Sequence, residues 1–71
     1  MNHDQVNQLF IDHKINDDQS FKIGRLAPTG SEETAQKRFE SRKRFLNYLQ
    51  KTLGFNYYES HKLLKYFRWN T

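Results

Sequence analysis

The sequence predicts a small all-α domain with three helices, at residues 3–14, 32–53 and 57–69, and an extended connector between the first two. Apolar residues in each helical segment recur at the three- and four-residue spacing of an amphipathic helix. Each segment is also preceded by a residue type that commonly caps a helix. Because the chain has 71 residues, we expect one domain at most, with a small core.

The first helix is predicted from its apolar spacing and its cap. Asn2 precedes Gln5 by three residues, which is the spacing of a capping pair. Residues 16–18 (Asn-Asp-Asp) then predict a loop, because their side chains bond to their own backbone in turns. The apolar face of this helix comprises Val6, Leu9, Phe10 and His13.

Residues 16–30 are predicted to be an extended connector. The brief alternation at Phe21 and Ile23 is compatible with a strand, but no partner strand is visible in the chain. We expect the apolar residues of the connector to cover the helices, and residues 28–30 (Pro-Thr-Gly) to end it in a turn. A strand that pairs with its copy in a homodimer is the alternative.

The second helix is expected to begin near residue 32 and to end near Leu53. Ser31 is a good N-cap, and Thr29 with Glu32 offers a second capping frame. Gly54 stands where a left-handed residue commonly ends a helix. At about 100° per residue, the predicted core stripe of this helix comprises Ala35, Phe39, Phe45, Leu46, Leu49 and Leu53.

The third helix is expected to begin after Asn56, which caps it together with Glu59. The turn before it is short, so the second and third helices should form a hairpin, either antiparallel or at the wider angle of a helix-turn-helix. The side that packs on the second helix should comprise Tyr57, Ser60, Leu63, Leu64 and Phe67.

Charge is divided between the two halves of the chain. Residues 1–33 have six acidic and three basic side chains, and residues 34–71 have nine basic and two acidic ones, so the halves carry −3 and +7 of the net charge of +4. A segment this basic attracts polyanions. The expected partner is therefore nucleic acid, either DNA or RNA, or an acidic protein surface.

The second helix carries a basic ridge formed by Lys37, Arg44 and Lys51 at seven-residue spacing. Such a ridge can follow a phosphate backbone by releasing condensed counterions. It can equally be an ordinary solvated helix face.

Arg38 and Arg42 differ from the ridge because they lie at the edge of the apolar stripe. A guanidinium buried there needs a partner. We expect a structural pairing with the acidic residues Asp12, Asp17 or Asp18. A grip on a phosphate or a carboxylate of a partner is the alternative.

The outward face of the third helix combines basic and aromatic side chains: Tyr58, His61, Lys62, Lys65, Arg68 and Trp69. Aromatic rings can stack on unpaired bases while cations hold the phosphates, which suits RNA or a single strand. On duplex DNA the same helix could enter the major groove. In the alternative without a ligand, the cations complement the helix dipole and Trp69 caps the small core.

No motif for catalysis, a metal or a cofactor is present. The chain has no cysteine, no glycine-rich phosphate loop and no recognisable nucleophile motif. His3, His13 and His61 do not have the i, i+4 spacing that places two imidazoles on one helix face. We therefore expect a protein that is not an enzyme.

Targeting signals and family motifs are absent as well. The N-terminal residues do not resemble a signal peptide, and no apolar run is long enough to span a membrane, so a cytoplasmic protein is expected. We recognise no known family in these motifs. Because the core is thin and has no disulfide, a homodimer is retained as an expectation.

Two functions follow from these features. The first is a small, non-enzymatic nucleic-acid-binding or regulatory module that uses the basic and aromatic face of the third helix, with phosphate contacts from Lys37, Arg44 and Lys51. The alternative is a small inhibitor or adaptor, of the kind that phages and mobile elements encode, that docks the same face on an acidic partner protein.

Overall fold

The computed structural model describes residues 2–29 and 31–69, and for Arg68 and Trp69 it describes the backbone alone. Within these ranges the chain forms four α-helices and no strand. The all-α class is therefore confirmed. The helices are α1 (His3–Asp12), α2 (Asp17–Leu26), α3 (Ala35–Asn47) and α4 (Tyr57–Trp69), and a π-helical turn, η1 (Tyr48–Thr52), continues α3.

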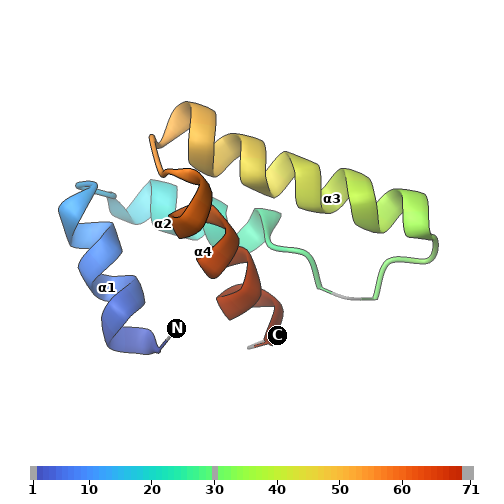
Figure 1. The fold of residues 1–71 in the computed structure, drawn as a ribbon, viewed down its shortest axis with the longest axis horizontal. Coiled ribbons are helices and arrows are strands. Elements are labelled where there is room, and N and C mark those ends of the chain that lie inside the picture. The colour runs from blue at the N-terminus through green and yellow to red at the C-terminus, as the bar shows by residue number, and fades with distance from the viewer. Residues whose placement is uncertain (1, 30, 70–71) are drawn as a thin grey trace.

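The helices cross one another and do not run side by side as a bundle (Figure 1). α4 descends steeply from the C-terminal end of α3, and α2 lies behind α4. α3 and α4 diverge from the short turn that joins them (Figure 1). The first turns of α3 extend beyond the other helices, toward the right of Figure 1.

The prediction of an extended connector is wrong for residues 17–26, which form α2. Asn16 accepts a hydrogen bond from the Gln19 backbone N–H at 2.8 Å, and the Gln19 side chain accepts one from the Asn16 backbone N–H at 3.0 Å. This capping box starts a helix where the sequence pattern was interpreted as a loop. Asp17 and Asp18 occupy the first turn, where the helix dipole favours negative charge.

α3 begins at Ala35, so the predicted start near residue 32 and the predicted N-cap Ser31 are wrong. Thr34 is its N-cap, because the Thr34 hydroxyl accepts a hydrogen bond from the Lys37 backbone N–H at 3.1 Å. The predicted frame of Thr29 and Glu32 does form its hydrogen bond, at 3.2 Å, but this bond lies in the preceding loop.

The predicted signals around the start of α4 are confirmed. Gly54 has a φ of +78°, the left-handed conformation that glycine adopts readily. Asn56 and Glu59 form a capping box with bonds of 2.8 and 3.0 Å. The capping pair of Asn2 and Gln5 is also present at the start of α1.

The core lies where the C-terminal half of α3 meets α2 and α4. Phe45, Leu49 and Leu63 are completely buried. The buried apolar residues come from every helix and comprise Val6, Ile23, Ala27, Phe45, Leu49, Phe55, Leu63 and Leu64. Phe45 also meets Phe67 edge to face, with ring centroids 6.0 Å apart.

α1 is fixed to the start of α4 by a contact of His13. Its ring lies 4.1 Å from that of Phe55, centroid to centroid, and its Nε2 lies 3.3 Å from a carboxylate oxygen of Glu59. This contact lies at the end of the molecule opposite the first turns of α3 (Figure 1).

Candidate functional site

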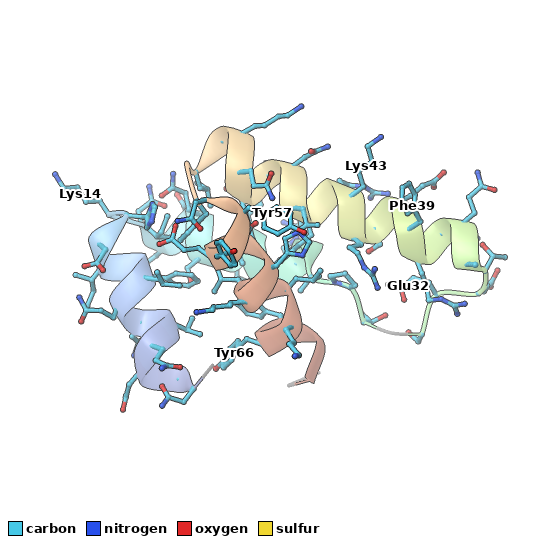
Figure 2. All side chains as sticks on the ribbon, viewed as in Figure 1. Lys14, Glu32, Phe39, Lys43, Tyr57 and Tyr66 are labelled. Atoms are coloured by element: carbon cyan, nitrogen blue, oxygen red, sulfur yellow. The ribbon has the colours of Figure 1, made fainter. Side chains whose placement is uncertain are left out.

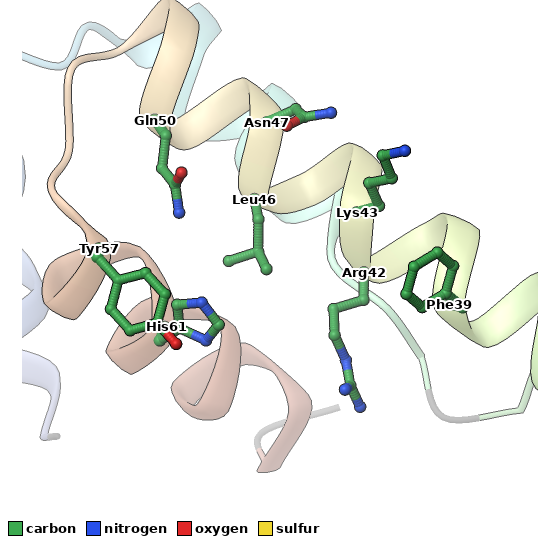
Figure 3. A pocket seen from close by; sticks show the side chains of 8 residues that line it. All are labelled: Phe39, Arg42, Lys43, Leu46, Asn47, Gln50, Tyr57 and His61. Carbon is green, nitrogen blue, oxygen red and sulfur yellow. The ribbon is translucent and has the colours of Figure 1, made fainter.

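An open groove of about 380 Å³ lies between α3 and α4 (Figure 3). Its volume is at the lower end of the range for ligand pockets, so it has room for a few side-chain-sized or base-sized groups. The described residues that line it comprise Phe39, Arg42, Lys43, Leu46, Asn47 and Gln50 from α3 and η1, and Tyr57 and His61 from α4.

A hydrogen-bonded chain fixes the end of the groove where α3 and α4 cross. The hydroxyl of Ser60, which is completely buried, donates to the Tyr57 carbonyl at 2.9 Å. The Gln50 side-chain amide donates to the same hydroxyl at 2.8 Å. Since a serine hydroxyl has one proton to donate, this pattern also fixes which way the Gln50 amide faces.

Aromatic rings stand at both ends of the groove (Figure 3). Tyr57 stacks on His61 at the crossing, with ring centroids 4.2 Å apart and ring planes inclined by 37°. Phe39 lies at the open end and is 64% exposed, and Tyr57 is 66% exposed. The rings therefore leave much of their surface available to a ligand.

Leu46 forms the half-buried floor between these rings, and two cations stand beside it. The Arg42 side chain extends into the space between the helices, whereas Lys43 points outward from the rim (Figure 3). Figure 2 shows Phe39 and Lys43 on the part of α3 that extends away from α1. None of the described lining residues is acidic, so the groove has a positive electrostatic character.

The basic and aromatic face predicted for the third helix continues from this groove. His61 lines the groove itself, and at about 100° per residue Lys65, Tyr58 and Lys62 follow it around α4. These three are exposed, Tyr58 to 75%. The side chains of Arg68 and Trp69 lie outside the described residues, so their predicted positions are not placed.

The structure does not bring the basic ridge into the groove. Lys37, Arg44 and Lys51 are exposed, and Lys37 and Arg44 lie about half a turn around α3 from Leu46. The Lys37 ammonium is 3.4 Å from a carboxylate oxygen of Glu33, an exposed i, i+4 pair.

The expected pairing of Arg38 and Arg42 with Asp12, Asp17 or Asp18 is wrong. Both arginines are exposed, and neither forms an ion pair with any residue in the described part of the chain. The reason is spatial: Asp17 starts α2 at the end of the molecule farthest from the first turns of α3 (Figure 1). Arg42 instead lines the groove.

Several groove residues were assigned elsewhere by the sequence pattern. Phe39 was predicted to be in the core but is exposed, and the same holds for Ala35, which lies outside the groove. Tyr57 was placed on the packed side of α4 and is also exposed. Helical periodicity gives the side of a helix on which a residue lies, but not whether another element covers that side. Asn47 and Gln50 carry no sequence signal that would assign them to a site.

Comparisons with protein-family models, with curated proteins and with solved structures yield no match to this chain. Separately, none of the helices in residues 2–29 and 31–69 has the length and apolar character needed to cross a bilayer.

Proposed function

We propose that the protein is a small, non-enzymatic module that binds nucleic acid through the α3–α4 face, which we define as the groove together with Tyr58, Lys62 and Lys65. The observation that supports this proposal is the grouping of exposed aromatic rings with cations around one open groove. Within the described residues these cations form no ion pair, and none of the described lining residues is acidic.

The two kinds of side chain serve different parts of a nucleic acid. Arg42, Lys43, Lys62 and Lys65 can contact phosphates and gain affinity by releasing condensed counterions. Exposed aromatic rings offer surfaces on which bases or sugars can pack. The rings of Phe39, Tyr57 and Tyr58 would otherwise expose apolar surface to water without a use.

An acidic protein partner is the second candidate, and the same groove favours it. Tyrosine and arginine are enriched among the residues that dominate binding energy at protein interfaces. Tyr57 and Arg42 flank the apolar Leu46 floor, where an apolar side chain of a partner could insert.

Fluorescence anisotropy with labelled duplex DNA, single-stranded DNA and RNA, at about 50 and 200 mM salt, tests the proposal. The key variant is Arg42→Gln with Lys43→Gln, and its charge-matched control is Lys37→Gln with Arg44→Gln. Each pair removes two exposed cations from α3. We expect the groove pair to weaken binding by at least about tenfold and the control pair by much less, because only the first pair is near the groove.

Equal losses in both variants would show non-specific attraction to a basic helix and would contradict the proposal. Binding that disappears at the higher salt for every nucleic acid would also contradict it and would favour the acidic protein partner.

A further inference from the structure

We infer that the groove between α3 and α4 seats unpaired bases, so that the ligand is a single strand of nucleic acid and not a duplex. This inference rests on the proposed function and specifies the class of its ligand.

The groove is long enough for a short segment of single-stranded nucleic acid to lie along α3. Phe39 precedes Leu46 by seven residues and Gln50 follows it by four, so at about 1.5 Å per residue the groove follows about 16 Å of α3. One ring stands at the open end, and the stacked pair of Tyr57 and His61 stands at the other. A strand lying between them can place a base against a ring at each end.

Base stacking requires access to the flat faces of the bases. In a duplex these faces are covered by neighbouring base pairs, and only the base edges and the backbone are presented to a protein. With a duplex as the ligand, the exposed rings of Phe39 and Tyr57 would therefore add no binding energy to that supplied by the cations. An unpaired strand can use both, since every base has a face on which an aromatic ring can stack.

At the end of the groove near Tyr57 and His61, the Gln50 side-chain amide is already held in position to bind such a ligand. The Gln50 amide nitrogen donates to Ser60, so its carbonyl oxygen has no hydrogen bond within the described part of the chain. Figure 3 shows the Gln50 amide directed into the space between the helices. Its oxygen can accept a hydrogen bond from an N–H group of a base.

Phosphates would lie along the two rims. Arg42 and Lys43 stand on the α3 side of the groove, and Lys62 and Lys65 stand beyond His61 on the α4 side. Cations therefore flank the rings on both sides, which is the arrangement of aromatic platforms in a positively charged channel that single-strand-binding proteins use.

The test compares Phe39→Leu and Tyr57→Leu with Phe21→Leu as the control. All three substitutions replace a largely exposed ring by an apolar side chain, but Phe21 lies on α2, outside the groove, and is 68% exposed. The probes are one labelled sequence as single-stranded DNA, as single-stranded RNA and as a DNA duplex, at about 150 mM salt. Circular dichroism confirms that each variant retains its helices.

We expect each groove variant to weaken single-strand binding by roughly 5- to 100-fold, the range found for loss of one base-stacking ring. Duplex binding by these variants, and all binding by Phe21→Leu, should stay within about twofold of the unmodified protein. A 2-aminopurine base in the single strand should change fluorescence on binding to the unmodified protein and less with Phe39→Leu.

Two outcomes overturn the inference. If the unmodified protein binds nucleic acid, but Phe39→Leu and Tyr57→Leu leave single-strand binding unchanged or weaken duplex binding equally, the bases are not seated in the groove and the proposed function still stands. If the unmodified protein binds none of the probes, the proposed function itself fails.

Discussion

Phe45 and Phe39 are the same residue type on the same helix, six positions apart, and their surroundings are opposite. Phe45 is completely buried beside Phe67, whereas Phe39 is 64% exposed. The difference arises because α2 and α4 pack against the C-terminal half of α3 and not against its first turns (Figure 1). On the same helix, Phe45 therefore stabilises the core and Phe39 lines the groove.

Truncating these two rings should have unequal effects on stability. Phe45→Ala should lower the free energy of unfolding by about 3–5 kcal/mol, because it leaves a cavity in a small core. Phe39→Ala, the matched control, should change it by no more than about 0.5 kcal/mol. Thermal and urea unfolding followed by circular dichroism measure both values. Comparable losses in the two variants would mean that the first turns of α3 are covered.

Capping residues were predicted correctly where the local chemistry is complete within a few residues. Asn2 with Gln5 and Asn56 with Glu59 each form the predicted capping box. Burial was predicted less well, because it depends on elements distant in the sequence. Arg42 was expected to need an acidic partner at a packed edge, but its side chain is exposed and lines the groove.

α2 shows how one residue type can indicate two structures. Asn and Asp favour turns, but they are also common N-caps and first-turn residues. The sequence was interpreted as a loop at residues 16–18, although Asn16 and Gln19 have the same three-residue spacing as Asn2 and Gln5. That spacing was the signal that could have identified α2.

The importance of this cap can be measured with Asn16→Ala. Loss of the capping box should lower the free energy of unfolding by about 1 kcal/mol. Asn7→Ala is the control, because Asn7 is exposed within α1 and its side chain forms no hydrogen bond in the described residues. Urea unfolding of both variants gives the comparison. If Asn16→Ala were as stable as Asn7→Ala, residues 17–26 would not depend on a helix cap.

At the scale of the whole molecule, both helices that border the groove come from the basic half of the chain. α3 and α4 belong to residues 34–71, whereas α1 and α2 belong to the acidic residues 1–33. The basic and aromatic character of the outward face of α4 was predicted from the sequence. The groove was not, because it exists only through the crossing of α3 and α4, and a short turn is compatible with more than one crossing angle.

The most direct test of the proposed site is to map binding on the protein by NMR, titrating the ¹⁵N-labelled chain with a short single-stranded oligonucleotide. We predict that the largest chemical-shift changes will lie at residues 57–65 and at the α3 and η1 residues that line the groove, which are Phe39, Arg42, Lys43, Leu46, Asn47 and Gln50, including the Asn47 and Gln50 side-chain amides. Changes centred on Lys37 and Arg44, or on Ile11 and Phe21 of α1 and α2, would contradict a binding site between α3 and α4.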